Sequence, residues 1–284
     1  MGSVTMAAVA AHFGRDIERT LAKLPGIVND AREHGADLLV LPDATLGGYL
    51  LDLHHPVDDG DSIPHSVELD GPEVAAIIDM ARDMTICFGI AEQSRSDGVW
   101  HRYNAAVCVT GDGVLGVHRK VHLPLGESEV YEPGTTFQAF DTPVGRIGML
   151  IDFDKTFPEA ARSVALDGAE IIACLSAWPA SVTDRSDRIR NDRQAHLFDL
   201  YDCARAAENQ VYLVSSNQTG VLGGLRFLGQ AKIVDPAGEI IAKTWAKGGL
   251  AVATADVTAD ISRARRSLHH LNQRAVHAYR LVHP

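Results

Sequence analysis

Short apolar runs alternate with segments of helical periodicity along most of this chain. Runs rich in Val, Ile and Leu are expected to form strands at Val4–Ala10, Leu38–Leu41, Thr85–Ile90, Ala105–Thr110, Arg146–Ile151, Ile171–Leu175, Val211–Ser215, Gln230–Val234 and Leu250–Val257. Helical periods precede several of them, at Ile17 to His34, Pro72 to Met84, Pro158 to Asp167 and Arg193 to Asn209. Strands that alternate with helices in this way predict a layered α/β domain.

Glycine marks the junctions between these elements. The segments 34–37 (HGAD) and 167–170 (DGAE) both place Gly-Ala-acid before an apolar run, where glycine supplies the left-handed backbone that ends a helix. Two further segments, 110–113 (TGDG) and 235–238 (DPAG), have the composition of hairpin turns. The predicted sheets are therefore mixed, either as one sheet or as two facing sheets with helices outside.

Composition and charge exclude several classes of protein. The 284 residues are 46% hydrophobic and contain no low-complexity stretch, so we expect one globular domain over residues 1–284. A formal charge of -11 opposes binding to nucleic acid or to an anionic membrane. No apolar run reaches the roughly 18 residues of a membrane span, and no leader-like segment begins the sequence, which predicts a cytoplasmic protein.

Four scattered cysteines show neither CxxC spacing nor Cys/His ligand spacing, which predicts free thiols: Cys87, Cys108, Cys174 and Cys203.

Charged residues stand at the ends of three apolar runs, where α/β proteins build their sites. Asp43 follows Pro42 directly after a strand. Lys120 lies in the stretch HRKVHLP, and Glu127 comes seven residues later. Asp152 ends the run GRIGMLI and precedes a helix that is expected to open near the segment FPE, 157–159.

Several ordered motifs give this sequence a specific resemblance to the nitrilase, or carbon-nitrogen hydrolase, superfamily. They are the strand-Pro-acid motif followed by Gly48-Tyr49, the HRKVHLP segment with Glu127 and Gly134, the elbow GRIGMLIDFDKTFPEAAR, and the segments GAEIIACLSAW, ARAAENQVYLVSSNQTG and FLGQAKIVDPAGEII. The resemblance covers almost the whole chain. It implies a four-layer αββα sandwich with two mixed sheets, and subunits that pair into a homodimer or a higher homo-oligomer. The C-terminal segment 263–284 is expected to be an arm that reaches across to a partner subunit.

The resemblance also implies a catalytic set, from which this chain departs at two positions. Family members use a Glu base, a Lys, a second Glu and a Cys nucleophile to cleave nitriles, amides or carbamoyl groups. Lys120 matches the Lys and Glu127 matches the second Glu. Asp43 stands at the position of the first Glu, and Asp152 at that of the Cys. A laboratory substitution at 152 would explain Asp152 but leave Asp43 unexplained.

An aspartate cannot readily take over the chemistry of the thiol. A thiolate forms a thioester that water later opens. A carboxylate that attacked an amide would form an anhydride, and the carboxylate is a better leaving group than the amine, so the adduct would collapse backwards. Three carboxylates beside one ammonium also raise the pKa of at least one acid, which provides an acid and a base together. Direct activation of water, proton abstraction, and displacement at an sp3 carbon through an aspartyl ester all remain open.

Other interpretations compete with catalysis. Asp152 and Lys120 would form an inert salt bridge in a retired site, Asp43 would be a turn residue, and Lys120 would be a solvated charge at a strand end. In that case the chain would bind a small molecule or support a partner. A metal held by the carboxylates is disfavoured by the central Lys. His118 and His122 are expected to be packed or hydrogen-bonded near the strand end.

The favoured hypothesis is a cofactor-independent and metal-free enzyme that acts on a small nitrogen-containing molecule. Asp43 or Asp152 would be the base, Lys120 would stabilise developing negative charge, and Glu127 would orient Lys120. Hydrolysis of a C–N bond and a related proton-transfer or elimination step are both compatible with this set. The predicted substrate-binding residues are Tyr49, Phe153, Trp178 and Arg185.

Overall fold

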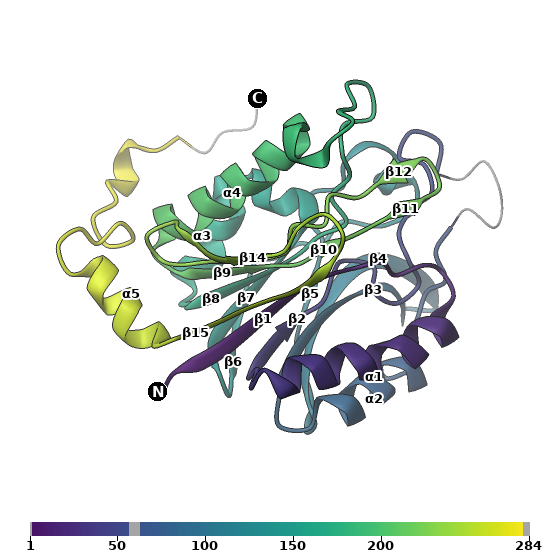
Figure 1. Ribbon diagram of the computed structural model, residues 1–284, viewed down its shortest axis with the longest axis horizontal. Coiled ribbons are helices and arrows are strands. Elements are labelled where there is room, and N and C mark those ends of the chain that lie inside the picture. The colour runs from purple at the N-terminus through teal and green to yellow at the C-terminus, as the bar shows by residue number, and fades with distance from the viewer. Residues whose placement is uncertain (1, 57–62, 281–284) are drawn as a thin grey trace.

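Two mixed β-sheets lie face to face in the computed structural model, which describes residues 2–56 and 63–280 (Figure 1). Within these residues the first sheet has seven strands in the order β10-β1-β2-β3-β4-β5, with β15 also paired to β1. The second sheet has six strands in the order β14-β13-β9-β8-β7-β6. The pairs β1/β2, β2/β3, β7/β8 and β8/β9 are parallel, so each sheet has a parallel centre.

The elements have the following bounds. Strands of the first sheet are β1 Val4–Ala11, β2 Leu38–Val40, β3 Thr85–Ser96, β4 Val99–Thr110, β5 Gly113–Arg119, β10 Asn217–Gln218 and β15 Gly249–Ala255. Strands of the second are β6 Ala139–Thr142, β7 Gly145–Ile151, β8 Ile171–Leu175, β9 Tyr212–Ser215, β13 Lys232–Val234 and β14 Ile240–Lys243. A small hairpin joins β11 Val221–Leu222 to β12 Leu225–Arg226. The α-helices are α1 Ile17–Glu33, α2 Pro72–Ala81, α3 Pro158–Leu166, α4 Arg193–Asn209 and α5 Val257–Arg265, and the 3-10 turns are η2 Leu125–Glu129, η3 Asp152–Thr156, η4 Ile189–Asn191 and η5 Val276–Ala278.

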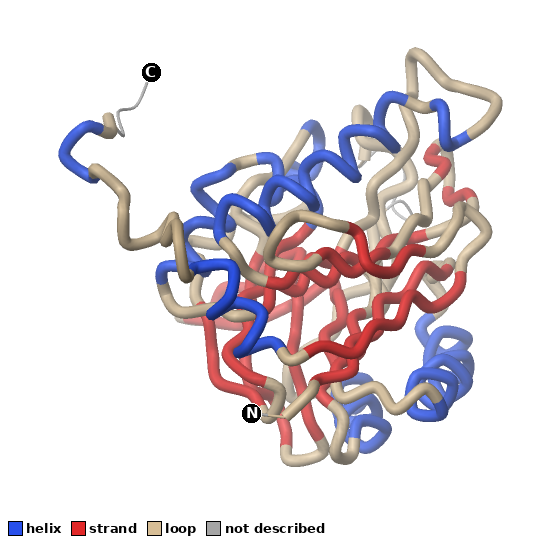
Figure 2. Tube along the Cα trace, turned by 60° about the vertical axis from the view of Figure 1, so that its left-hand side comes forward, coloured by secondary structure: helices blue, strands red, loops and turns tan. Residues whose placement is uncertain are grey.

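Helices cover the outer face of each sheet, which confirms the predicted αββα sandwich. Helices α1 and α2 lie on the first sheet, and α3 and α4 lie on the second (Figures 1 and 2). Strand β1 shows how the alternation of side chains divides the core. Met6 and Ala8 pack between the two sheets, whereas Ala7 and Val9 pack beneath α1 and α2. Both faces of β1 are therefore buried, as its unbroken apolar run predicts.

The glycines and turn residues predicted most ends of the helices and strands correctly. Gly35 and Gly168 have φ values of 71° and 92°, which confirms the left-handed backbone expected after α1 and α3. The hairpins β4/β5 and β13/β14 form at the two predicted turns. The two strands of the β3/β4 hairpin are longer than predicted. Next to the turn both contain polar, partly exposed residues, which the search for apolar runs did not include. The predicted strand end at Val257 was wrong, because Asp256 caps the start of α5 by accepting from the Ala259 N–H at 3.0 Å.

The C-terminal segment is tied to the sandwich at one place and then leaves it. Gln210 Nε2 donates to the carbonyl oxygens of Ala264 and Leu268, and Leu271 packs against the core under α3 and α4. Beyond this point the chain extends away from the body (Figure 2). Residues 281–284 of the predicted arm lie outside the described residues. No helix in the described part of the chain is long and apolar enough to cross a bilayer.

Candidate functional site

Asp43, Lys120, Glu127 and Asp152 come from four separate segments and meet in the interior. We call them the acid–lysine cluster. Asp43, Lys120 and Glu127 have no exposed surface, and Asp152 is 5% exposed. Asp43 and Asp152 follow the carboxyl ends of β2 and β7, and Lys120 follows β5. The fold thus brings the charged ends of the predicted strands together.

Lys120 is at the centre of the cluster. Successive residues of an extended chain point to opposite faces, so Lys120 points into the cluster while its neighbour Arg119 points away from it. Its Nζ lies 2.7 Å from Oε1 of Glu127 and 3.6 Å from Oδ2 of Asp152. Burial lowers the pKa of Lys120, but the charges of Glu127, Asp152 and Asp43 outweigh it and raise the pKa above its ordinary value. Lys120 is therefore a stable ammonium, and the alternative of a solvated strand-end lysine is wrong.

Glu127 lies in the first turn of η2 and binds two donors through one oxygen. The Lys120 ammonium and the Tyr49 hydroxyl both donate to Oε1. Oε2 is buried without a partner among the described residues. Burial raises the pKa of Glu127, although Lys120 and the Tyr49 hydrogen bond oppose the change. Tyr49, which was predicted to bind substrate, thus helps to hold Glu127 in place.

Asp152 occupies the sharp turn between β7 and η3. Its φ of 47° lies in the left-handed region, which aspartate tolerates better than branched side chains do. Burial raises the pKa of Asp152, while Lys120 and then Lys155 lower it. At 3.6 Å the contact with Lys120 is longer than a hydrogen bond, and Oδ1 has no partner in the described structure.

Asp43 lies in the turn after β2, and its backbone is fixed from two sides. The Thr45 hydroxyl donates to the Pro42 carbonyl at 2.7 Å, and Gln218 Nε2 donates to the Asp43 carbonyl at 2.8 Å. Asn104 Nδ2 donates to Oδ2 of the Asp43 side chain at 3.2 Å, whereas Oδ1 is buried without a described partner. Burial raises the pKa of Asp43 to about 7, with Asp152 and Glu127 adding to the effect and Lys120 opposing it.

The cluster therefore combines a firm ammonium with a carboxyl that exchanges its proton near neutral pH. Three carboxylate oxygens, one from each acid, are buried and free of described partners. Buried polar atoms normally have hydrogen-bond partners, so these oxygens are positions where water or a bound molecule would be accommodated. A base, an electrostatic stabiliser and open acceptors together suit proton transfer coupled to water attack.

Asp154 secures the turn that bears Asp152. It accepts from the backbone N–H groups of Ile151, Val121 and His122, and the rings of His118 and His122 lie 2.9 and 2.8 Å from its two oxygens. Burial alone would raise the pKa of Asp154, but these hydrogen bonds hold it well below its usual range. The two histidines are hydrogen-bonded at the strand end, as predicted.

The other three predicted substrate-binding residues contact groups outside the cluster. Phe153 packs edge-on against Phe157 with ring centroids 5.2 Å apart, and Arg185 is exposed and donates to the Gly224 carbonyl at 2.8 Å. Trp178 is buried and donates through Nε1 to Gln194 at 3.0 Å. Their role in substrate binding stays a prediction. Asn104 and Gln218, which position Asp43, were not predicted because an isolated amide in a strand carries no distinguishing sequence signal.

In the part of the chain that the structure describes, no cysteine is hydrogen-bonded to the acid–lysine cluster. All four cysteines are free thiols, and Cys87 and Cys108 are partners across β3 and β4. Cys174 is buried on β8, and burial raises the pKa of its thiol to about 12, so it is protonated at neutral pH. Among residues 2–56 and 63–280, no group of three or more His, Cys, Asp or Glu side chains is arranged to hold a metal ion.

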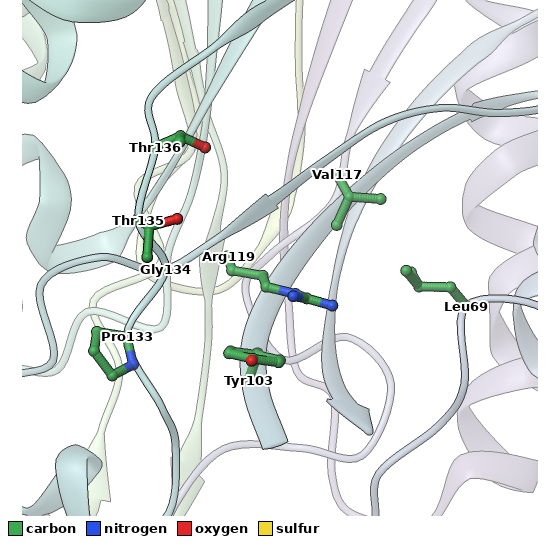
Figure 3. Close-up of a pocket in the computed structure, with 8 residues that line it drawn as sticks. All are labelled: Leu69, Tyr103, Val117, Arg119, Pro133, Gly134, Thr135 and Thr136. Atoms are coloured by element: carbon green, nitrogen blue, oxygen red, sulfur yellow. The ribbon is translucent and has the colours of Figure 1, made fainter. Parts of the chain in front are cut away.

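A surface cavity of about 340 Å³ lies on the opposite side of the end of β5 and is distinct from the cluster. Figure 3 shows Arg119 beside the Tyr103 ring, with Thr135 and Thr136 on a neighbouring segment. The Arg119 guanidinium is 3.9 Å from the ring centroid and donates to both carboxylate oxygens of the buried Glu92. Arg119 and Lys120, adjacent in sequence, therefore belong to different environments.

Comparison with known proteins gives consistent matches. The family model described as carbon-nitrogen hydrolase matches residues 5–266. A nitrilase from Pyrococcus abyssi is 31% identical over 226 residues, covering 79% of this chain and 78% of that protein. An N-carbamoylputrescine amidase from Arabidopsis thaliana is 28% identical, covering 88% of this chain and 85% of that protein. The crystal structure of a carbon-nitrogen hydrolase from Helicobacter pylori G27 superposes with a TM-score of 0.82 at 24% identity, covering 98% and 97% of the two chains.

Proposed function

The chain belongs to the carbon-nitrogen hydrolase family, and we propose that it hydrolyses a C–N bond of a small nitrogen-containing molecule without a cysteine nucleophile. The observation that supports this proposal most directly is the Asp43 carboxyl. Its pKa is about 7, it has an unpartnered oxygen, and it lies within the field of the Lys120 ammonium. Such a group accepts a proton at neutral pH and returns it within one catalytic cycle.

We assign Asp152 and Asp43 to the positions that a cysteine and a glutamate hold in the family pattern. In a Glu-to-Gln mutant of an amidase from Nesterenkonia sp. AN1, 21% identical, the acetamide moiety of fluoroacetamide is covalently attached to the active-site cysteine. A cysteine thiolate carries an acyl group as a thioester during hydrolysis. A carboxylate cannot replace it in this role, because the tetrahedral adduct of a carboxylate and an amide expels the carboxylate more readily than the amine. Water is therefore the proposed nucleophile.

The reaction proceeds in two steps. Asp43 Oδ1 takes a proton from water, and the water oxygen forms a bond to the carbonyl carbon of the substrate. The electron pair of the carbonyl moves to its oxygen, where the Lys120 ammonium stabilises the negative charge. The protonated Asp43 then donates to the departing nitrogen as the C–N bond breaks, which restores Asp43 and leaves an acid and an amine.

Glu127 and Asp152 support these steps. Glu127 fixes Lys120 at 2.7 Å and is itself fixed by the Tyr49 hydroxyl, so the ammonium is oriented before substrate binds. The unpartnered Oδ1 of Asp152 is available to accept the second hydrogen of the attacking water. This division makes Asp43 the base and Asp152 the group that orients the water.

The proposed substrates are small amides and N-carbamoyl amines, and nitriles are included in the panel because a nitrilase is among the relatives. A panel of these compounds is incubated with the protein, and released ammonia is measured from pH 5 to 9. We expect turnover of at least one compound, with a rate that rises through about pH 7 as Asp43 loses its proton. Asp43→Asn should abolish turnover, whereas Asp79→Asn, an exposed change on α2, should not. Absence of turnover across the panel, together with unchanged ligand binding in Asp43→Asn, would instead favour a protein that only binds a small molecule.

Labelled water tests for attack by Asp152 with hydrolysis at the Asp152 carboxyl carbon. After a single turnover in ¹⁸O water, direct attack places one ¹⁸O in the product and none in the protein. Attack by Asp152 followed by hydrolysis at its own carboxyl carbon would leave ¹⁸O in the peptide that contains residue 152. Mass spectrometry of that peptide detects this label, and finding it would refute direct attack by water.

We further propose that the chain forms a homodimer or a larger homo-oligomer through the segment that follows α5. The exposed side chains of Leu268, Val276 and Tyr279 support this, because a segment that leaves its own sandwich has apolar surface to cover. Light scattering should give a multiple of 30.6 kDa, and truncation after residue 272 should reduce it. A monomeric parent would overturn this proposal.

A further inference from the structure

A second group of buried charges lies beneath the turn that bears Asp152. Lys155 and Lys232 donate to the two oxygens of Asp202 at 2.8 and 2.7 Å, and none of the three side chains is exposed. They come from η3, β13 and α4, so three separate elements converge on one carboxylate. We call this set the lysine–aspartate cluster.

One carboxylate in this cluster faces two ammonium groups. Lys232 alone would neutralise Asp202, and it has a further partner in Asp199 at 3.2 Å, at the edge of the site. Within residues 2–56 and 63–280, Lys155 forms no ion pair with a second carboxylate. Its ammonium lies 3.4 Å from the Phe198 ring centroid, which the Lys232 ammonium also approaches, at 3.6 Å. A ring stabilises a cation less than a carboxylate does. Lys155 is thus a surplus buried cation, which is costly unless another charge benefits from it.

Asp152 is the acid of the acid–lysine cluster that shares a 3-10 turn with Lys155. Lys155 is three residues further along the same 3-10 turn, and its ammonium lies 5.0 Å from the centroid of the Trp178 ring. The end of this turn is tied to α4, because Arg205 donates to the carbonyl oxygens of Lys155 and Thr156 at 2.7 and 3.0 Å. With all groups ionised, the acid–lysine cluster has three negative charges and one positive charge. Lys155 supplies part of the missing positive charge from beneath the turn.

We propose that Lys155 is a positioning residue that favours the ionised form of Asp152 and orients this side chain at the turn. The charged or titratable groups of the described residues that act on Asp152 include Lys120 after β5, Glu127 in η2, Asp43 after β2, Lys155 in η3, the Tyr49 hydroxyl and the Cys174 thiol on β8. Lys155 also lowers the pKa of Asp152, second to Lys120 among the charges that do so. The catalytic consequence rests on the proposed function, since it is the ionised carboxylate that orients water.

The test is Lys155→Met, which removes the surplus cation and leaves the Asp202–Lys232 pair intact. The matched control is Lys243→Met, which removes a cation from the outer end of the same network, where Lys243 contacts Asp199. Aspartate labelled with ¹³C at the side-chain carboxyl is titrated by NMR, and the Asp152 signal is assigned from its loss in Asp152→Asn. We expect the Asp152 titration midpoint to rise by about one pH unit or more in Lys155→Met and to stay near the parent value in Lys243→Met.

An unchanged midpoint in a folded Lys155→Met protein would overturn the proposal, even if urea unfolding showed lower stability. If that variant fails to fold, Lys155→Gln is titrated instead and should show the same rise, whereas Lys155→Arg should restore the parent midpoint. The NMR readout needs no substrate. If the Asp152 midpoint shifts but the protein has no turnover, the electrostatic role of Lys155 is supported and the proposed function is refuted. If the protein has turnover but the midpoint does not shift, the proposed function stands and the role of Lys155 is refuted.

Discussion

The ammonium of Lys120 lies 2.7 Å from Oε1 of Glu127, and neither side chain has any exposed surface. Lys120 is the ammonium of the acid–lysine cluster, so its removal leaves Glu127 and Asp43 without the positive charge that offsets their carboxylates. We expect Lys120→Met to reduce the free energy of unfolding by about 3–5 kcal/mol at pH 8. The loss should be smaller at pH 5, where the orphaned acids can take up protons. Urea unfolding at the two pH values measures this, and an equal loss at both would contradict it.

The raised pKa of Asp43 predicts how stability depends on pH. Because its folded pKa is about 7 and its ordinary value is 3.8, the folded state binds a proton that the unfolded state has released between these values. This contribution to stability is complete below pH 4 and is lost as pH rises through 7, amounting to at most about 4 kcal/mol. Asp43→Asn should flatten the decline. Urea unfolding between pH 4 and 8 tests this, and parallel curves for parent and variant would refute it.

Asp154 predicts the opposite slope in a separate pH window. Its folded pKa lies below the ordinary 3.8, so its contribution is present above that value and is lost as pH falls further. Asp154→Asn should lower the free energy of unfolding by about 2–3 kcal/mol at pH 7, because the hydrogen bonds to a charged acceptor are weakened. The difference from the parent should shrink toward pH 2 in acid-unfolding curves. A difference that stayed constant would exclude Asp154 as the source.

The layered fold and much of the cluster could be predicted from sequence because both follow from local patterns. Apolar runs with glycine at their ends located the strands, and charged residues directly after those runs pointed to Asp43, Lys120 and Asp152. Glu127 was singled out in the same way, seven residues after Lys120, and the resemblance to a known family added its role. The residues left open one sheet or two facing sheets, and the resemblance favoured two. A residue directly after an apolar strand is placed correctly whenever the strand itself is predicted correctly.

The lysine–aspartate cluster could not be predicted in this way. Lys155, Asp202 and Lys232 are 30 or more residues apart, and each resembles an ordinary solvated charge on its own element. Only the packing of α4 against the second sheet brings them together. The role of Asn104 was missed for the same reason, since a hydrogen bond over 61 residues has no local signal.

Gly89 on β3 tests whether the position of Asp43 depends on close backbone packing. A Cβ atom at Gly89 would lie 2.4 Å from the Ala44 nitrogen and 2.7 Å from the Asp43 Cα, distances that require the turn after β2 to move. Gly89→Ala should therefore destabilise the protein by about 1–3 kcal/mol, as overpacking does. It should also shift the pH midpoint of the Asp43 contribution away from about 7, because the carboxyl leaves its place beside Asn104. Gly26→Ala in α1 is the control, since a Cβ there meets nothing within 4 Å and replacing a helical glycine should stabilise by about 0.5–1 kcal/mol. Urea unfolding at several pH values measures both effects, and a Gly89→Ala protein with parent stability and an unchanged midpoint would show that the turn is not fixed by this contact.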